Sequence, residues 1–349
     1  MPNALPSPLS DLLQQTSRTF YRTLRILPAA VRPQISLAYL LARTSDTIAD
    51  TEIIPLEARL RALQQLRVRI LGTGDGPLEF GELARQQSLP AERALLAHCE
   101  ASLAALRELS VADAQLVRKV LDTITSGQEL DLRRFHAAAA ERIVALQTDA
   151  ELDDYTYRVA GCVGEFWTRI CLAHVFELAE LDGIPLPATF EGLGVRFGKG
   201  LQLVNILRDL PADLHKGRCY LPEEKLSKAG LKPEDLSRAA NMERFRPSYH
   251  DYLNRAESHL AAGWEYTNLI PFACWRLRLA CAWPILIGLE TIKRLRVENV
   301  LDPQRRVKIS RADVRRLISR SVLCYPWPTA WKRMVMATLS TSGGGGSSP

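Results

Sequence analysis

The sequence has 349 residues, of which 47% are hydrophobic and 24% are charged. These fractions are typical of a folded globular chain and exclude disordered, collagen-like and fibrous proteins. Lysine and arginine number 45 against 39 aspartates and glutamates, which gives a formal net charge of +6. The basic residues are scattered and form no long tract, so we expect anionic ligands and no nucleic acid partner.

Helical periodicity dominates the chain. Apolar residues recur at three- and four-residue steps, whereas the two-residue alternation of strands is scarce. The clearest periodic stretches are 56–70, 103–109 and 116–124. Short breaks rich in glycine and proline fall at 72–77, 182–187 and 217–222. Since none of these breaks is long enough for an interdomain linker, we predict one all-α domain over residues 1–335 and a flexible Gly/Ser-rich tail over 336–349.

No targeting or membrane-spanning segment is predicted. Residues Met1–Pro8 are polar and proline-rich, and they lack the basic start and apolar core of a secretory signal. The most apolar stretch, Leu269–Leu289, contains Arg276 and Arg278 near its middle. Each would cost roughly 2.5–3.5 kcal/mol at the centre of a bilayer. The seven cysteines are odd in number and show no C-x-x-C spacing, which predicts buried, reduced thiols and a cytoplasmic protein.

The first acidic constellation is the pair Asp46 and Asp50. Four residues apart, the two carboxylates project from one face of a helix, where like charges repel unless a cation lies between them. Such a pair suits Mg²⁺, a hard cation that takes oxygen ligands and shares its shell with phosphates. Two solvated acids without a ligand are the alternative interpretation.

The second constellation comprises Asn205, Asp209 and Asp213, which step by four residues along one helical face. Pro211 stands between the two aspartates and should kink or end the helix. Either the change of helix direction at Pro211 reorients the Asp213 side chain, or the helix is locally distorted without functional consequence. Guanidinium and amide groups nearby could clamp a phosphate beside a metal ion. The side chains of this kind are Gln202, Arg208 and Arg218.

Two acidic faces in an all-α domain suggest a site for diphosphates. Ionising an allylic diphosphate requires a metal that neutralises the leaving group and a dry, apolar pocket that shields the carbocation. We therefore expect a central apolar cavity between the two aspartate-rich motifs, with Mg²⁺ as the metal and Mn²⁺ as the alternative. The expected metal ligands are Asp46, Asp50, Asn205, Asp209 and Asp213.

Several ordered motifs match one known family. They are Ser17-Arg18-Thr19-Phe20, Arg43 with Asp46-Thr47-Ile48-Ala49-Asp50, Tyr155 ahead of Val159-Ala160-Gly161-Cys162-Val163-Gly164, and Asn205-Ile206-Leu207-Arg208-Asp209 with Asp213 and Gly217-Arg218-Cys219-Tyr220-Leu221-Pro222. In these motifs the chain resembles the squalene/phytoene synthases, the head-to-head branch of the isoprenoid synthase fold.

The resemblance implies a Mg²⁺-dependent prenyltransferase that condenses two molecules of farnesyl diphosphate to presqualene diphosphate. It implies that the first aspartate motif ionises the donor and that the second binds the acceptor, so all four aspartates would be catalytic. Tyr155 would assist proton removal, although an aromatic side chain that fills a helix interface is the alternative. The diphosphate-binding residues that it implies are Ser17, Thr19, Arg43, Gln202, Asn205, Arg208 and Arg218.

Members of this family differ in the second half-reaction. The stretch Val307-Lys308-Ile309-Ser310-Arg311 resembles one in members that reduce the intermediate with NADPH. This implies cofactor contacts by Arg306, Lys308 and Arg311, with a solvated basic turn as the alternative. We therefore expect a squalene synthase of sterol or hopanoid biosynthesis. The alternative is a phytoene/dehydrosqualene or presqualene diphosphate synthase that lacks the reductive step.

Two interpretations from other classes stay open. A helical scaffold or lipid carrier would keep the cavity without turnover, and a terpene cyclase would make a cyclic product from one diphosphate. The Gly217–Pro222 motif argues against the cyclase. Because the implied substrate and product are lipidic, we also expect peripheral membrane contact, and we expect a monomer.

Overall fold

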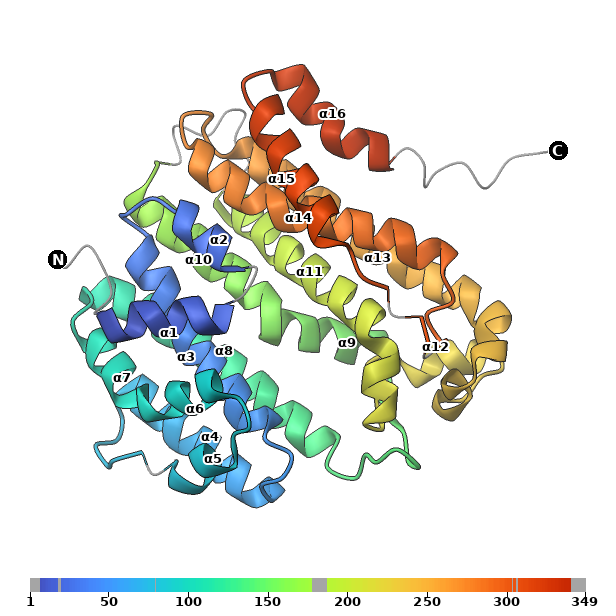
Figure 1. Cartoon of the computed structure of the whole chain (residues 1–349), viewed down its shortest axis with the longest axis horizontal. Coiled ribbons are helices and arrows are strands. Elements are labelled where there is room, and N and C mark those ends of the chain that lie inside the picture. The colour runs from blue at the N-terminus through green and yellow to red at the C-terminus, as the bar shows by residue number, and fades with distance from the viewer. Residues whose placement is uncertain are drawn as a thin grey trace. The chain divides into compact units, whose positions relative to one another are not determined.

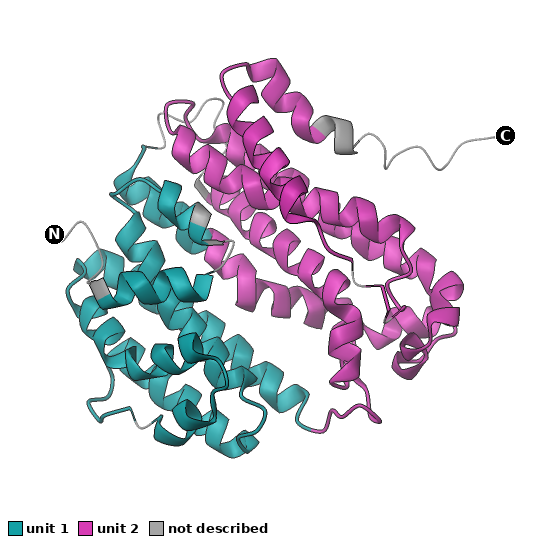
Figure 2. Cartoon of the chain, in the orientation of Figure 1, with its two compact units in different colours: residues 1–136, 165–178 teal, residues 137–164, 179–349 magenta. Residues whose placement is uncertain are grey.

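The computed structural model describes residues 7–17, 20–78, 80–177, 187–302, 304–305 and 307–339, and the chain divides into two compact units (Figures 1 and 2). Unit 1 comprises Met1–His136 and Glu165–Leu178, and unit 2 comprises Ala137–Gly164 and Ala179–Pro349. Apart from one pair of two-residue strands, the regular elements of the described residues are helices. The all-α prediction is therefore confirmed, whereas one domain over 1–335 with a tail over 336–349 stays a prediction.

Unit 1 is built from short and medium helices around two long ones. Its elements are α1 (Ser7–Ser17), α2 (Phe20–Ile26), α3 (Arg32–Asp50), α4 (Leu56–Leu71), α5 (Gly81–Gln86), α6 (Pro90–Ala97), α7 (Cys99–Arg107), α8 (Val111–Arg134) and most of α10 (Cys162–His174). The predicted helices over 56–70, 103–109 and 116–124 correspond to α4, α7 and α8. The predicted break after residue 71 is confirmed, because Gly72 ends α4 in the left-handed conformation at φ 76°.

The core of unit 1 forms where α3 and α4 pack on α8. Leu40 and Leu41 of α3, Leu66 of α4 and Leu121 of α8 are fully buried there. One polar link crosses this interior: buried Asp113 accepts hydrogen bonds from Gln34 of α3 at 3.1 Å and from His174 of α10 at 2.7 Å. The burial of the apolar stripe on each helix fixes which face of α3 stays accessible.

Unit 2 contains the longest helices of the described residues. Its elements are β1 (Val144–Ala145), α9 (Asp149–Thr156), the π-helix η1 (Tyr157–Gly161), the start of α10, α11 (Pro187–His215), β2 (Arg218–Cys219), α12 (Glu223–Lys228), the 3₁₀ turns η3 (Pro233–Ser237) and η4 (Ala239–Asn241), α13 (Met242–Leu269), α14 (Trp275–Val297), α15 (Arg311–Cys324) and α16 (Pro328–Leu339). The predicted break at 182–187 lies almost wholly outside the described residues, and the break at 217–222 follows the end of α11.

The core of unit 2 is a layer of packed helices in which α13 contacts both α11 and α14 (Figure 1). Phe190 of α11 stacks on Tyr266 of α13 with ring centroids 4.4 Å apart, and both side chains are fully buried. The strands β1 and β2 pair in parallel, with Val144 opposite Arg218. Sequence periodicity gave no sign of this pair, because strands of two residues are too short for an alternation.

Two sequence predictions, one on membrane-spanning segments and one on the burial of cysteines, can be compared with the structure. Within the described part of the chain, no helix combines the length and the apolar character that crossing a membrane requires. Five of the seven cysteines are buried, as predicted for thiols in apolar helices.

Candidate active site

The first aspartate motif lies at the C-terminal end of α3 in unit 1. Arg43, Asp46 and Asp50 are all on this helix, so the two carboxylates share one face as the spacing predicts. Arg43 bridges two acids: its Nη2 donates to Glu92 Oε1 at 2.7 Å, and its Nη1 lies 3.6 Å from Asp46 Oδ2. The guanidinium group is thereby held beside the motif.

The carboxyl group of Asp46 is perturbed by its surroundings. Burial and then the like charge of Asp50 raise its pKa to about 6, although Arg43 and a hydrogen bond from Gln128 of α8 act in the opposite direction. Its side chain is still 45% exposed, which leaves it accessible to a ligand. A carboxylate destabilised by a neighbouring carboxylate gains from a bound cation.

Gln128 and Glu92 are site residues that the sequence patterns did not predict. Gln128 stands in phase with buried Leu121 and Ile124 of α8, so a polar side chain at a core-facing position is the signal that could have identified it. Its Oε1 is buried and has no hydrogen-bond partner among the described residues. Glu92, on short helix α6, carries no such signal.

The N-terminal motif is described only in part. Ser17 ends α1, is buried, and donates its hydroxyl hydrogen to the carbonyl of Leu13. Its hydroxyl oxygen keeps its acceptor sites. Thr19 lies outside the described residues, so the two predicted phosphate contacts of this motif stay predictions.

The second aspartate motif lies on α11 in unit 2. Gln202, Asn205, Arg208, Asp209 and Asp213 all belong to this helix, which runs without interruption to His215. Asn205, Asp209 and Asp213 therefore share one face. Of the two predicted effects of Pro211, an end of the helix at this residue is wrong, and a kink stays a prediction.

A buried tyrosine explains how the helix accommodates this proline. Pro211 has no N–H, so the carbonyl of Leu207 loses its helical partner. Tyr249 of α13 donates its hydroxyl hydrogen to that carbonyl at 3.0 Å. Tyr249 is fully buried, and burial raises the pKa of its phenol. The helix thus stays continuous through the motif.

Within the motif, Arg208 and Asp209 form a two-point ion pair. Arg208 Nε donates to Asp209 Oδ1 at 3.0 Å and Nη2 to Oδ2 at 2.5 Å, and both side chains are one-third exposed. Asn205 is exposed one turn before. The arrangement offers an anion and a cation side by side on an accessible face, as metal and diphosphate ligands require.

Gly217 turns the chain from α11 into the segment that carries Arg218 and Tyr220. It adopts φ 74°, and a Cβ atom there would lie 2.3 Å from the carbonyl oxygen of Ala139, so only glycine fits. Its carbonyl accepts a hydrogen bond from Val144 at 2.8 Å. The strand pair β1–β2 therefore fixes Arg218 directly after the second motif.

Tyr155 is brought to the same segment by an aromatic contact. Its ring stacks on that of Tyr220 with centroids 4.7 Å apart and planes 22° apart, and the side chain is buried. Both interpretations of Tyr155 keep support, since stacking fills an interface and also fixes the ring orientation.

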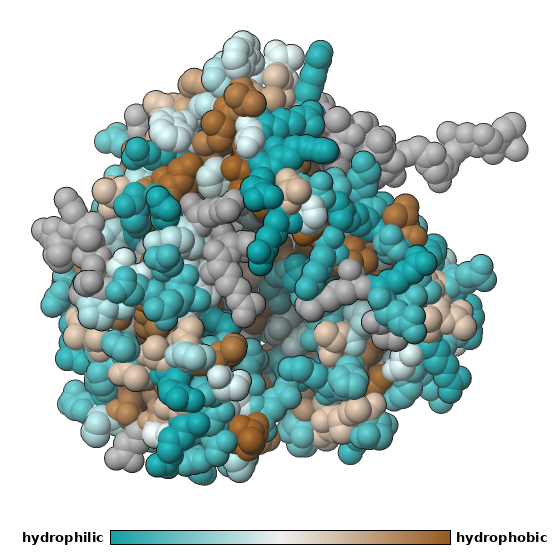
Figure 3. Space-filling model, viewed as in Figure 1, coloured by the Kyte–Doolittle hydropathy of each residue, from teal (hydrophilic) through white to brown (hydrophobic). Residues whose placement is uncertain are grey.

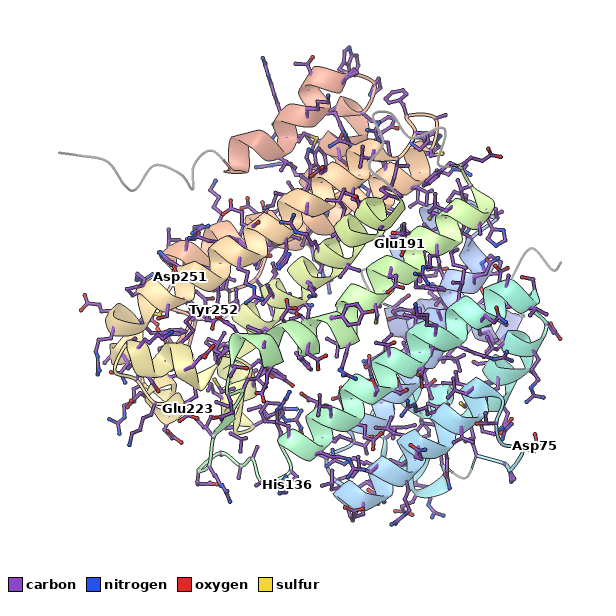
Figure 4. The ribbon with its side chains drawn as sticks, turned by 180° about the vertical axis from the view of Figure 1, so that it is seen from behind. Asp75, His136, Glu191, Glu223, Asp251 and Tyr252 are labelled. Carbon is purple, nitrogen blue, oxygen red and sulfur yellow. The ribbon has the colours of Figure 1, made fainter. Side chains whose placement is uncertain are left out.

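Helix α9, which carries Tyr155, is anchored by ion pairs on another face. Lys199 of α11 donates to Asp153 Oδ2 at 2.7 Å, and Arg255 of α13 donates to Asp153 Oδ1 at 3.1 Å. Tyr252, labelled on α13 in Figure 4, donates to Asp149 Oδ1 at 3.0 Å. These bonds join α9 to two long helices of unit 2.

The small residues after Tyr155 allow a close approach of helices. A Cβ on Gly164 would lie 1.9 Å from the carbonyl oxygen of Gly194, and one on Gly198 would lie 2.2 Å from that of Ala160. The backbone of the Val159–Gly164 stretch therefore contacts α11 directly. The π-helix η1 begins two residues after Tyr155, and such local widening is frequent at functional sites.

The predicted NADPH contacts lie before and at the start of α15. Lys308 and Arg311 are exposed, and the carbonyl of Lys308 accepts a hydrogen bond from Arg294 Nη1 at 2.8 Å. Arg306 lies outside the described residues. Two exposed cations beside a helix N-terminus suit the phosphates of a dinucleotide, and their role stays a prediction.

The donor groups of both aspartate faces fit Mg²⁺. Among the described residues no three His, Cys, Asp or Glu side chains are grouped to hold a metal ion. Mg²⁺ commonly uses only one or two protein carboxylates and completes its shell with waters and substrate phosphates. Paired carboxylates such as Asp46 and Asp50 therefore suffice, and a cation would relieve the repulsion that raises the pKa of Asp46.

Solved structures share this helical fold. The complex of TcSQS with the ligand E5700 aligns with a TM-score of 0.75 and 20% identity, over 96% of this chain and 90% of that one. The squalene synthase HpnC from Alicyclobacillus acidocaldarius aligns with a TM-score of 0.59 and 19% identity, over 86% and 97%. At these identities the likeness concerns the fold.

The chain belongs to the squalene/phytoene synthase family, which it matches over residues 13–313. A presqualene diphosphate synthase of Rhodopseudomonas palustris is 32% identical over 77% of this chain and 81% of its own length. A squalene synthase of Schizosaccharomyces pombe is 27% identical over 89% of this chain and 64% of its own length. The family predicted from the motifs is thereby confirmed.

Proposed function

We propose that the protein condenses two molecules of farnesyl diphosphate to presqualene diphosphate and inorganic diphosphate. The observation that carries this proposal is that the chain belongs to the squalene/phytoene synthase family and is more than 30% identical to presqualene diphosphate synthases of Rhodopseudomonas palustris and Zymomonas mobilis. Two helix faces with paired carboxylates and adjacent arginines support it, because the reaction must hold two diphosphates.

On α3, Asp46 and Asp50 would hold Mg²⁺ against the donor diphosphate, while Arg43, fixed by Glu92, contacts its oxygens. Bound Mg²⁺ neutralises charge on the leaving group. The C1–O bond of the donor then breaks, and its electron pair leaves with the diphosphate. Charge-assisted hydrogen bonds of the guanidinium group stabilise that charge as it forms.

On α11, Asp209, Asp213 and Asn205 would hold Mg²⁺ with the acceptor diphosphate, which is retained in the product. Arg208 would exchange its pairing with Asp209 for a phosphate oxygen. The double bond of the acceptor supplies the electrons of the new carbon–carbon bond, and loss of a proton closes the cyclopropane. Tyr155, oriented by its stack on Tyr220, would assist that proton removal.

A squalene synthase is the second candidate. Similarity to the Schizosaccharomyces pombe squalene synthase and the exposed cations Lys308 and Arg311 favour it. NADPH, when bound, supplies the hydride that reduces presqualene diphosphate to squalene with release of its diphosphate. Both candidates share the condensation step.

Product analysis separates the candidates. The protein is incubated with farnesyl diphosphate and Mg²⁺, with and without NADPH, and the products are extracted and identified by mass spectrometry. Presqualene diphosphate under both conditions supports the first candidate, and squalene only with NADPH supports the second. Dehydrosqualene regardless of NADPH contradicts both, and the absence of any condensation product contradicts the enzyme assignment.

A further inference from the structure

Unit 2 exposes a patch of apolar side chains where the loop 270–274 meets the α15–α16 turn. Ten large apolar side chains are exposed among the described residues, and five of them lie here. We call this group the aromatic patch: Phe272 (53% exposed), Trp275 (45%), Val322 (47%), Leu323 (69%) and Trp327 (64%). In Figure 3 apolar surface gathers near the α15–α16 end of unit 2. Such a cluster marks an interaction surface.

The patch rests on a rigid base. Phe272 stacks on Tyr325 with centroids 4.8 Å apart, and the Tyr325 hydroxyl donates to the carbonyl of Phe272 at 2.5 Å. Trp331 meets Tyr325 edge-on at 5.1 Å, and buried Arg278 lies over both the Phe272 and Tyr325 rings. Because these contacts fix the loop and the turn before any partner binds, docking would cost little ordering entropy.

The helices beside the patch concentrate the positive charge of the chain. Residues 307–335, here called the basic segment, contain seven lysines and arginines and one aspartate, a net charge of +6 that equals the formal charge of the whole protein. All seven basic side chains are exposed. The single acid, Asp313, is paired with Arg294 at 2.9 Å.

Apolar and basic groups occur on the same helix face. Leu323 follows Arg320 by three residues and Arg316 by seven on α15, spacings that align side chains on one face. Lys332 and Arg333 are exposed on α16 shortly after Trp327. Trp and Phe at the water boundary, aliphatic tips and flanking cations are the composition of surfaces that insert into the headgroup region of membranes.

Charge and composition discriminate between partners. A second copy of this chain docked on the same surface would place one basic segment against another, which like charges oppose. Stacked nucleotide bases would suit the rings but not Val322 and Leu323. An anionic bilayer suits both the apolar side chains and the basic segment, since its acyl region accepts aliphatic groups and its headgroups attract lysine and arginine.

We propose that the aromatic patch and the basic segment dock this protein on the surface of an anionic phospholipid bilayer. The aromatic and aliphatic tips enter the interface, and the flanking cations pair with lipid phosphates. The surface lies in unit 2 and uses neither aspartate motif. Because membrane binding can be measured without substrate, membrane docking can be refuted while the proposed condensation reaction holds. Equally, the reaction can be refuted while membrane docking holds.

Co-sedimentation of the full chain with vesicles tests the proposal. The protein should pellet with vesicles of phosphatidylcholine and phosphatidylglycerol at low salt, bind phosphatidylcholine alone more weakly, and dissociate as salt is raised. Leu323→Ser combined with Trp327→Ser should lower the partition coefficient about tenfold or more. Arg320→Glu combined with Lys332→Glu should have an effect of similar size.

Matched substitutions outside the patch serve as controls. Val297→Ser removes an equally exposed apolar side chain of unit 2, and Lys228→Glu with Arg238→Glu reverses two exposed charges on and after α12. Both should bind vesicles as the unchanged protein does. Thermal unfolding of every variant checks that it is folded, and because the altered side chains are exposed we expect midpoints close to that of the unchanged protein.

Three results would overturn the proposal. One is failure of the unchanged protein to pellet with anionic vesicles at low salt. A second is equal binding by the patch variants and the controls. A third is binding of single-stranded RNA in place of vesicles, which would assign the surface to nucleic acid.

Discussion

Tyr249 of α13 donates its hydroxyl hydrogen, at 3.0 Å, to the carbonyl of Leu207, the group that Pro211 leaves without a helical partner. This bond lies within the second aspartate motif, because Leu207 stands between Asn205 and Asp209, and Pro211 stands between Asp209 and Asp213. A proline that would ordinarily end a helix is thereby tolerated, and the three ligand candidates keep their common face.

Removing this hydroxyl should destabilise the fold. Tyr249→Phe leaves the buried Leu207 carbonyl without a partner, which costs about 1–3 kcal/mol. Urea denaturation measures the free energy of unfolding. In the Pro211→Ala background the cost should shrink, because the introduced alanine has a backbone N–H that can bond the same carbonyl.

The double-mutant cycle distinguishes this mechanism from simple loss of packing. An equal cost of Tyr249→Phe in both backgrounds would show that Pro211 and Tyr249 are not coupled. Far-UV circular dichroism of all four proteins provides the check that α11 remains helical.

Regular spacing made part of the site predictable. Asp46 and Asp50, like Asn205, Asp209 and Asp213, were placed correctly on one helix face each, because four residues make nearly one helical turn. The face on which these residues lie depends on local helix geometry alone, and the helical apolar periodicity around them is enough to predict the helix.

Tertiary partners were not predictable in the same way. Gln128 reaches Asp46 from 82 positions along the chain, and Tyr249 reaches Leu207 from 42. No periodic pattern encodes such pairs, since they depend on how helices pack. An end of α11 at Pro211, one of the two predicted effects of this proline, is wrong for this reason: proline removes a local hydrogen bond, and a distant hydroxyl compensates for the lost donor.

The glycines after Tyr155 should not tolerate alanine. In Gly164→Ala the new methyl group would meet the backbone of Gly194 at 1.9 Å, so α10 and α11 must separate. Overpacking of this kind costs about 1–3 kcal/mol or more, and denaturant titration measures it. Gly192→Ala on α11 is the control, because a Cβ there meets nothing within 4 Å. That change should stabilise the helix by up to about 1 kcal/mol. Similar effects of both changes would contradict the close backbone contact.

Asp46→Asn should abolish condensation of farnesyl diphosphate. The amide keeps the shape of the side chain but removes the charge that would hold Mg²⁺, and the turnover rate should fall roughly 100-fold or more. Asp122→Asn is the matched control in unit 1, because Asp122 forms a pair with Arg67 at 2.6 Å in which both side chains are about one-third exposed, and such pairs contribute little to stability. Unchanged turnover in Asp46→Asn would contradict the catalytic role, and prenyl binding without turnover in the unchanged protein would favour a lipid carrier.

His259 of α13 should make the stability of the fold depend on pH. Burial, followed by the positive charges of Arg196, Arg255 and Lys199, lowers its pKa from 6.5 to about 4, although Asp153 acts in the opposite direction. Its Nδ1 is buried and has no hydrogen-bond partner among the described residues. The neutral imidazole is therefore the form that the native state accommodates.

The direction in which stability changes with pH depends on whether the folded or the unfolded state binds the proton at the higher pH. As pH falls below about 6.5 the unfolded chain takes up a proton at this residue and the folded protein does not, so stability declines until pH reaches about 4. The slope contributed by this one residue is at most about 1.4 kcal/mol per pH unit.

Urea denaturation between pH 4.5 and 7.5 measures this slope. His259→Gln cannot take up the proton and should flatten the decline, whereas His136→Gln, a change at an exposed histidine, should leave it in place. Parallel pH profiles for the unchanged protein and His259→Gln would refute the assignment.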